Sequence, residues 1–301
     1  MNVADRPRDP ACLRHHADVE PISTWTVPLP EVSGLSSRPV AGGVLLLALG
    51  DDRVAFASTL VVDGVPGGFD IVTADDVGAR PGYEERATQL EAVAVDGAGT
   101  AWLLTEGTSM VGGVDLAERR IVSRLLIDTT PIPDLHASWS KKNASRGEGM
   151  LLLRDGHLLV AKEKKPAGLV ELGPRGHEAH GISTATLLGE DEAWTPPSDD
   201  DGLSALAWWP WKGEGTGDLK DLSDLAPDHE GGVWVLSDQS RCLTRLVLPL
   251  DPGEPIAVAS TAKLPKRIAK PEGLAFLGGG LIAVADDRKD TRHNLTILRL
   301  A

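Results

Sequence analysis

Five times along the chain, an acidic residue opens a short apolar run, a hairpin turn follows, and a second apolar run ends in another acid. The opening acids of these five copies are Glu31, Glu91, Glu148, Asp224 and Glu272. Short runs of Val, Leu and Ile between Gly and Asp-Gly turns are typical of β-hairpins, and no long stretch has helical spacing. The pattern therefore predicts an all-β chain built on an internal repeat.

Most copies contain enough apolar runs for four strands, which is the content of one β-propeller blade. Five copies predict a five-bladed propeller. The last copy has room for three strands, and the alternating segment 23–29 is predicted to supply the fourth by pairing with 294–300. This pairing would close the ring and remove free sheet edges. A six-bladed propeller is the alternative, because the apolar segment 204–211 lies in the long interval between the third and fourth copies.

The organisation that follows is a flexible N-terminal tail over residues 1–21 and a single propeller domain over 22–301. Hydrophobic residues make up 42% of the chain, as expected for a globular protein. The net charge of −14 argues against non-specific nucleic-acid binding, which needs a basic surface. No apolar run is long enough to span a membrane and no secretion signal is visible, so a cytoplasmic protein is expected.

The repeat also predicts where the acids gather. The two ends of an antiparallel hairpin lie at one sheet edge, and the first strand of each propeller blade lines the axis. The five opening acids should therefore ring one mouth of the central channel. The closing acids should form a wider ring on the same face: Asp51–Asp52, Glu106, Glu163, Asp238 and Asp286–Asp287. Asp96, Asp155 and Asp228 should form turns at the opposite face.

A ring of carboxylates is electrostatically unfavourable, because like charges raise each other's pKa or require a cation. A Ca²⁺ ion on the axis is one remedy, since Ca²⁺ prefers oxygen ligands. The predicted ligands are Glu31, Glu91, Glu148, Asp224 and Glu272. The alternative is a structural belt in which Arg53, Lys162, Lys164, Arg241 and Arg288, all close to closing acids, neutralise the ring.

Other metal and nucleophile motifs are absent from the sequence. There is no EF-hand, HExxH, P-loop or GxSxG pattern, so covalent catalysis has little support. The eight His residues show no zinc-ligand spacing. His177 and His180 lie in a polar segment and are interpreted as surface residues.

Two long connections are expected on the acidic face, over 128–147 and 189–223, and they carry five of the eight Trp residues. Long connections in compact domains often act as lids or binding loops. The alternative is that these Trp side chains pack between blades. Together with basic residues near the acids, they give the predicted ligand-binding set: Arg53, Trp139, Arg146, Lys162, Lys164 and Arg288.

The chain resembles the SdiA-regulated family of propellers and, more distantly, phytase-like and esterase-like propellers. The similarity is carried by EVSGLS at Glu31, GEGMLLL at Gly147, DLSDLAPD at Asp221 and PEGLAF at Pro271. It spans about residues 22–300 and implies a five- or six-bladed propeller, with the family's carboxylates at the five opening acids. For the phytase-like relatives it implies calcium and action on phosphoesters. The first and fourth copies depart from the pattern, with Val32-Ser33 after Glu31 and with Asp221 competing for the place of Asp224.

The leading hypothesis is a propeller with an acidic, Ca²⁺-binding funnel that binds a small polar molecule. If it is an enzyme, we expect metal-assisted hydrolysis of an ester or phosphoester, with Glu106 or Glu163 moving the proton. A second hypothesis is a non-catalytic interaction module whose aromatic loops dock a partner chain. A third is a metal-free enzyme of a biosynthetic or sugar-processing pathway that uses paired carboxylates.

Overall fold

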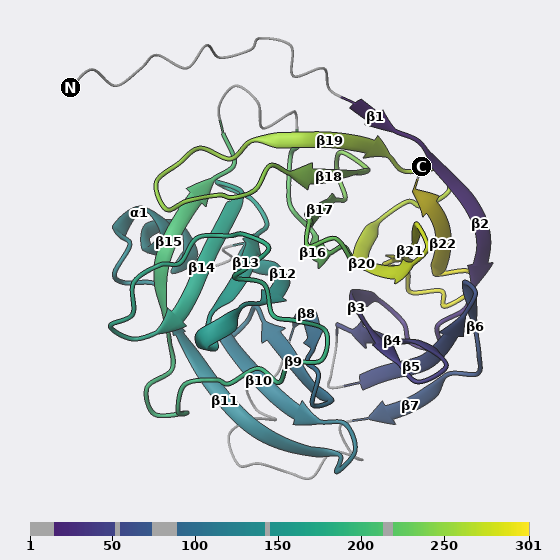
Figure 1. The fold of residues 1–301 in the computed structure, drawn as a ribbon, viewed down its shortest axis with the longest axis horizontal. Helices are drawn as coiled ribbons and strands as arrows, with labels where there is room; N and C mark the ends of the chain where they lie inside the picture. The colour runs from purple at the N-terminus through teal and green to yellow at the C-terminus, as the bar shows by residue number, and fades with distance from the viewer. Residues whose placement is uncertain (1–14, 52–54, 74–88, 142–144, 213–218, 301) are drawn as a thin grey trace.

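The computed structural model describes residues 15–51, 55–73, 89–141, 145–212 and 219–300. The chain is all-β, as predicted, and its sheets surround a common centre (Figure 1). The one α-helix in the described residues is α1, Pro133–Trp139, and a 3₁₀ turn covers Arg154–Gly156. In the described part of the chain, no helix has the length and apolar character needed to cross a membrane.

Two sheets contain the N-terminal strands. In the first, β2 and then β22, β21 and β20 lie side by side, with bounds Val19–Trp25, Leu295–Leu300, Leu281–Asp286 and Pro271–Gly278. In the second, the order is β1, β19, β18, β17 and β16, with bounds His15–Ala17, Val258–Lys263, Cys242–Leu246, Val233–Ser237 and Asp224–Pro227. The described residues 15–21, inside the segment predicted to be a tail, thus contain strand structure.

The predicted partner of the last strand is present, although shifted. β2 pairs antiparallel with β22 from Val19 opposite Leu300 to Trp25 opposite Leu295. The paired segment thus begins four residues before the predicted Ser23. The residues that follow β2 are also tied to the C-terminal region, since Asn294 Oδ1 accepts a hydrogen bond from the Val27 N–H at 2.8 Å.

The third sheet contains β3, β4, β5, β6 and β7, with bounds Val32–Val40, Gly43–Gly50, Ala55–Val62, Val65–Pro66 and Asp70–Thr73. The fourth sheet has eight strands. Its first four are β8, β9, β10 and β11, with bounds Leu90–Val95, Thr100–Thr105, Met110–Asp115 and Arg120–Asp128. Its other four are β12, β13, β14 and β15, with bounds Gly147–Leu152, Leu158–Lys162, Gly168–Pro174 and Leu203–Pro210.

The structure thus has four sheets where the sequence predicted five. The difference comes from β11 and β15, the outer strands of two four-stranded units, which pair in parallel through two residues each, Ile127–Asp128 and Leu203–Ser204. The segment considered for a sixth blade forms β15, which pairs antiparallel with β14 as an outer strand of its unit.

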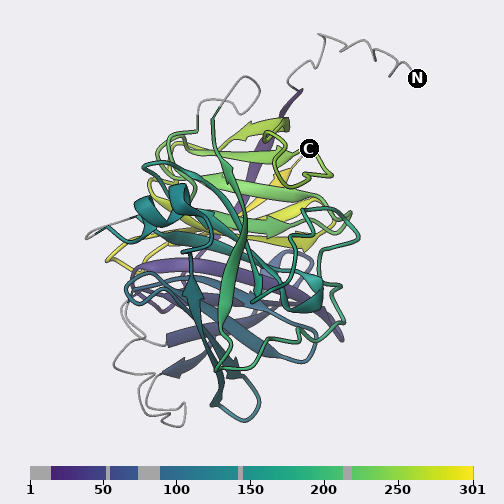
Figure 2. The same cartoon turned by 90° about the vertical axis from the view of Figure 1, so that its left-hand side faces the viewer.

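The first strand of each unit lies toward the centre (Figure 1), and Figure 2 shows the same molecule from the side. These inner strands contact one another in sequence: β3 with β8, β8 with β12, β12 with β16, β16 with β20, and β20 with β3. Apolar side chains fill the space between neighbouring units and form separate buried clusters around the centre. The inner strands and their ends position the candidate site.

Candidate functional site

Three of the five predicted metal ligands come together. Glu91 on β8, Glu148 on β12 and Glu272 on β20 each offer a carboxylate oxygen, and the three oxygens lie within 4.8 Å of one another. We call these residues the glutamate triad. All three side chains are partly buried, so residues far apart in the sequence form one acidic cluster.

Small residues beside the acids let the inner strands approach closely. A Cβ atom on Gly149 would lie 2.6 Å from the Leu225 backbone nitrogen on β16. A Cβ on Gly273 would lie 2.7 Å from the side chain of Leu35 on β3. The Glu-Gly pairs of the repeat thus have a physical reason, because the glycine removes the atom that would hold neighbouring inner strands apart.

The surroundings of the triad favour its protonated forms. Burial and the charges of Asp51 and Glu106 raise the pKa of Glu91 to about 8. Burial, followed by the charge of Glu91, raises the pKa of Glu148 well above its ordinary value. Burial also raises the pKa of Glu272 to about 7. Near neutral pH, the triad therefore holds protons or needs a cation.

Lys270 supplies one positive charge to this cluster, and sequence analysis did not identify it. Its Nζ lies 3.1 Å from a carboxylate oxygen of Glu272 and also pairs with Asp287. The only sequence signal was its position two residues before Glu272. Lys270 opposes the rise in the pKa of Glu272, and Lys164 interacts electrostatically with Glu148.

Asp224, the fourth predicted ligand, has a different role in the structure. It is 1% exposed, and its carboxylate accepts hydrogen bonds from the backbone N–H groups of Leu225 at 2.7 Å and Leu274 at 2.6 Å. The Leu35 N–H also donates to it. Burial nevertheless raises the pKa of Asp224. This carboxyl joins three inner strands and is not part of the triad.

Glu31, the fifth predicted ligand, also lies outside the triad. It precedes β3 in a left-handed conformation with φ 46°, and its carboxylate is 3.8 Å from Lys289 Nζ. The Lys289 side chain is 90% exposed. The first copy of the repeat departs from the others at Val32-Ser33, and its acid is correspondingly displaced from the triad.

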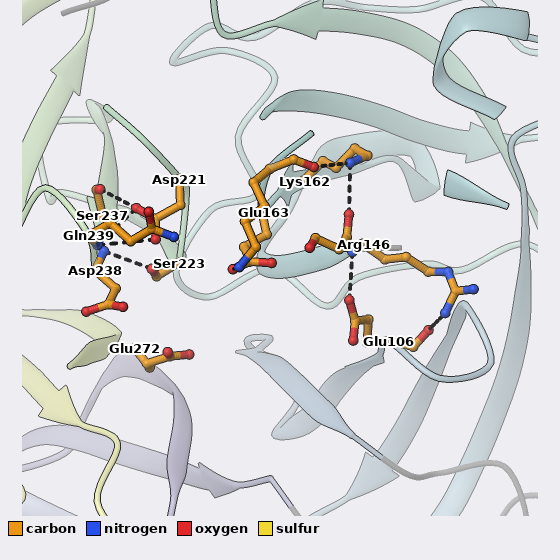
Figure 3. Close-up of polar contacts among 12 residues, drawn as sticks. Glu106, Arg146, Lys162, Glu163, Asp221, Ser223, Ser237, Asp238, Gln239 and Glu272 are labelled. Carbon is orange, nitrogen blue, oxygen red and sulfur yellow. Dashed lines mark hydrogen bonds and ion pairs between the residues drawn. The ribbon is translucent and has the colours of Figure 1, made fainter. Parts of the chain in front are cut away.

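The two predicted catalytic acids, Glu106 and Glu163, each have a basic neighbour, and Figure 3 shows Glu106 beside Arg146. Glu106 Oε1 accepts a hydrogen bond from the Arg146 backbone N–H at 2.7 Å, and its carbonyl oxygen accepts one from Arg146 Nη1 at 2.8 Å. Glu163 forms an ion pair with Lys164. The charges of Glu106 and Glu163 both contribute to the raised pKa of Glu148.

Lys162 is fully buried and fastens the backbone beside these acids. Its Nζ donates to the carbonyl oxygens of Ser145 at 2.8 Å and Lys164 at 2.6 Å. Burial lowers the pKa of Lys162 to about 8, although Glu163 and Glu106 oppose this effect. An ammonium group engaged in this way has a structural role, which does not fit the expectation that Lys162 contacts a ligand.

Two basic residues of the predicted ligand-binding set remain, Arg288 and Arg53. Arg288 is paired with Asp286 and donates to the Arg267 carbonyl oxygen at 2.8 Å. Arg53 lies outside the described residues.

The competing acid Asp221 is 2% exposed and accepts hydrogen bonds from Ser237 and Gln239 (Figure 3). Beside it, burial and the charge of Asp221 raise the pKa of Asp238 to about 6.

In the described part of the two long connections, four of the five Trp side chains are buried: Trp139, Trp194, Trp209 and Trp211. Trp139 is 4% exposed in α1, and its indole N–H donates to Ser109 at 2.9 Å. Trp194 is also 4% exposed, and its indole donates to the His157 carbonyl oxygen at 3.0 Å. Trp209 is buried in β15. Burial removes the surface that the ligand role of Trp139 and the partner-docking role of Trp139 and Trp209 would need.

The structure has a cavity of about 330 Å³ at the opposite end of the inner strands from the triad. Its apolar walls include Leu35, Val93, Met150, Leu187, Ala226 and Phe276. Gly189 and Glu190 form part of the wall, so the start of the second long connection lies at the turn end. Sequence analysis had placed it on the acidic face.

The triad fits a hard cation by the chemistry of its donors. One ion with Ca²⁺–oxygen distances of about 2.3–2.6 Å can contact oxygens up to roughly 5 Å apart. The 4.8 Å limit within the triad satisfies this condition. Three carboxylates offer at most six oxygens, and Ca²⁺ commonly completes its shell with water.

No protein-family model matches the chain, and no curated protein matches it. Solved structures do. The glutaminyl cyclase of Myxococcus xanthus matches over 95% of this chain and 97% of its own, with a TM-score of 0.54 and 12% identity. The PQQ-bound aldose sugar dehydrogenase of Streptomyces coelicolor matches over 95% and 98%, with a TM-score of 0.48 and 13% identity. Agrobacterium tumefaciens regucalcin, a calcium-binding protein, covers 93% and 94%, with a TM-score of 0.48 and 11% identity.

The glutaminyl cyclase is a propeller-like protein, and this match supports a propeller-like fold for the chain. At 12% identity, the likeness to glutaminyl cyclase concerns the fold alone. The neighbours give no support for the SdiA-regulated or phytase-like names.

Proposed function

We propose that the chain is a five-bladed β-propeller that binds Ca²⁺ at the glutamate triad and a small polar ligand beside it. The observation that carries the proposal is the meeting of three carboxylates from three inner strands, within 4.8 Å of one another. Their pKa values are raised, first by burial and then by neighbouring carboxylates. Ca²⁺ would stabilise the ionised triad by replacing its protons.

The count of five blades follows from the inner strands. Five of them contact each other in a ring, and each begins an antiparallel unit. The parallel contact between β11 and β15 involves only two residues of each strand, so we treat the eight-stranded sheet as two blades. The pairing of β2 with β22 then completes the last blade. We also propose, from its motifs, that the chain is related to the SdiA-regulated and phytase-like propellers.

We further propose metal-assisted hydrolysis of an ester or phosphoester as the reaction, if the protein is an enzyme. Bound Ca²⁺ supplies a Lewis acid for the substrate's carbonyl or phosphoryl oxygen. Glu163 and Glu106 lie close enough to raise the pKa of Glu148 electrostatically, and either carboxylate could accept or return a proton. Lys164 and Arg146 stand beside these acids and could hold an anionic group.

A second candidate is metal-free acid–base chemistry by the triad itself. It is favoured by the pKa values of about 8 for Glu91 and about 7 for Glu272, because an acid that titrates near neutral pH can both give and take a proton. In this case the triad would share protons without a metal.

Calorimetric titration of CaCl₂ into chelator-treated protein tests the leading proposal. We expect one bound Ca²⁺ per chain and a melting temperature that rises with the logarithm of Ca²⁺ concentration. Glu148→Gln should weaken binding at least tenfold, because it removes one charged ligand. Glu118→Gln, an exposed acid in the turn between β10 and β11, is the matched control and should leave affinity unchanged.

The absence of Ca²⁺ binding at millimolar concentration would contradict the cation site. Carbon NMR then tests the second candidate by measuring the pH at which each Glu carboxyl titrates. Titration midpoints near pH 7–8 that do not change with Ca²⁺ would support proton sharing, and ordinary midpoints would contradict both proposals.

A further inference from the structure

A second group of metal-binding side chains lies away from the triad, around the hairpin of β13 and β14. His157 immediately precedes β13, Glu171 lies within β14, and His177 and His180 follow β14. His157 and Glu171 have fully buried side chains, whereas His177 and His180 are exposed. One ligand atom from each of His157, Glu171 and His180 lies within 4.8 Å of the others.

Glu171 fixes the orientation and tautomer of His157. Its Oε1 lies 2.8 Å from His157 Nδ1 and accepts a hydrogen bond from the His180 backbone N–H, also at 2.8 Å. Its Oε2 accepts one from the Gly181 N–H at 3.0 Å. An ionised carboxylate is only an acceptor, so His157 Nδ1 donates and the lone pair of a neutral ring is on Nε2. Metal-binding imidazoles are commonly held by such a carboxylate.

The second ring nitrogen of His157 faces another imidazole. His157 Nε2 lies 3.3 Å from His177 Nδ1. Two nitrogens bound to one tetrahedral Zn²⁺ at about 2.0–2.1 Å are separated by roughly 3.3 Å. The observed spacing is therefore that of two ligands on a single zinc ion. A hydrogen bond from His177 to His157 would give the same distance, and the experiment must separate the two.

His180 is placed to supply a third nitrogen. Its ring stacks on that of His157, with 3.9 Å between centroids and 12° between planes. Parallel stacked rings cannot both direct an in-plane lone pair to one ion, so His180 must rotate off the stack when a metal binds. Its exposure leaves the side chain room to do so, while its backbone stays fixed to Glu171.

We infer that His157, His177 and His180 form a site for Zn²⁺ or a similar borderline divalent cation, with Glu171 as its positioning residue. Imidazole ligands favour such ions over Ca²⁺, which prefers oxygen. Three histidines would leave one tetrahedral position for water or a ligand atom. The ion would tie segment 177–180 to the buried end of the β13–β14 hairpin.

The test is titration of chelator-treated full-length protein with ZnCl₂ in saturating CaCl₂, followed by calorimetry, and with CoCl₂, followed by visible absorption. We expect one tightly bound Zn²⁺ and a tetrahedral Co²⁺ spectrum. His177→Ala should weaken Zn²⁺ binding at least tenfold, and this exposed substitution should not impair folding. Glu171→Gln should weaken it about 10–100-fold, as for other carboxylate partners of metal-bound histidines.

His229→Ala is the matched control. His229 is exposed, and its Nδ1 is hydrogen-bonded to the carboxylate of Glu190. Its substitution should leave the Zn²⁺ affinity and the Co²⁺ spectrum unchanged. Zn²⁺ binding that is equally tight in His177→Ala would overturn the inference. So would an absence of stoichiometric binding, which would show that His177 and His157 form only a hydrogen bond.

Discussion

The two ends of the inner strands use acidic residues in opposite ways. At the turn end, Asp96 accepts four hydrogen bonds, from the backbone N–H groups of Ala98, Thr100 and Trp194 and from the Trp102 indole, at 2.9–3.2 Å. At the other end, the glutamate triad places three carboxylates within 4.8 Å of one another. The turn-end carboxylate is surrounded by donors, whereas the triad faces other acids.

The turn-end arrangement recurs in another copy of the repeat. Asp228 accepts hydrogen bonds from the Glu230 and Gly232 N–H groups and from the Trp234 indole, six residues further along the chain. The Asp96–Trp102 pair has the same spacing. These aspartates hold their hairpins, as the turn pattern predicted. In this protein, the number of hydrogen-bond donors around a carboxylate therefore distinguishes a structural acidic residue from a candidate functional one.

Replacing Asp96 by Ala should produce the largest effect at the turn end. The substitution leaves the Trp102 indole and three backbone N–H groups without their acceptor, and buried unpaired donors cost about 1–3 kcal/mol each. We expect the free energy of unfolding to fall by about 3 kcal/mol or more in urea denaturation. Asp155→Asn is the control, because Asp155 is exposed with φ 58° and Asn tolerates that conformation. Equal effects would refute the distinction between the two aspartates.

Gly149→Ala tests whether close approach of the inner strands assembles the triad. The added Cβ would lie 2.6 Å from the Leu225 backbone, and overpacking of this kind costs about 1–3 kcal/mol. Urea denaturation and Ca²⁺ titration should show a loss of stability together with weaker binding. Gly68→Ala is the control, since a Cβ there has no neighbour within 4 Å. If the Gly149→Ala protein is destabilised but keeps its Ca²⁺ affinity, the close approach of the inner strands is not needed to assemble the triad.

The triad should make the metal-free protein less stable as pH rises. The pKa of Glu91 goes from 4.5 to about 8 on folding, so the native state holds protons that the unfolded chain has released. By linkage, the unfolding free energy falls between about pH 4.5 and pH 8. Each tenfold change in proton affinity corresponds to about 1.4 kcal/mol, so this shift gives an upper bound of about 5 kcal/mol. Solvent screens the partly buried triad, and we expect a loss on the order of 2 kcal/mol.

Urea denaturation in chelator at several pH values measures this loss. Glu272→Gln should reduce the slope, because it removes a charge that raises the pKa of Glu91 and a carboxyl whose own pKa is raised. Saturating Ca²⁺ should reduce the slope in the unsubstituted protein. A stability that rises from pH 5 to pH 8 in chelator would contradict the raised pKa values.

The smallest effect is expected at Glu31. Its carboxylate lies 3.8 Å from Lys289 Nζ, whose side chain is 90% exposed, and exposed ion pairs contribute at most about 1 kcal/mol. Glu31→Gln should therefore change stability by a few tenths of a kcal/mol and Ca²⁺ affinity less than twofold in the same titrations. A tenfold loss of affinity would place Glu31 in the site after all.

The hydrophobic alternation and the turn residues were sufficient to predict the all-β class, the hairpins and the gathering of several acids at one end of the inner strands. Such features are local, since they depend on period-2 patterning and on Gly and Asp at turns. The same patterning also indicated the partner of the last strand, although it missed the starting residue of β2. A register depends on the partner's side chains as well as on the segment itself.

Only the tertiary structure decided which acids belong to the site. The sequence treats Asp224 and Glu148 as equivalents, but Asp224 is held by backbone donors from three strands, while Glu148 meets other carboxylates. Likewise, Trp139 is buried because α1, the helix that contains it, packs against the core. His157 contacts His177 and Glu171 only because the β13–β14 hairpin and the segment that follows it fold together. Repeats determine which residue types occur and at which strand ends. Hydrogen-bond donors, burial and neighbouring charges, which determine the chemistry, come from other parts of the chain.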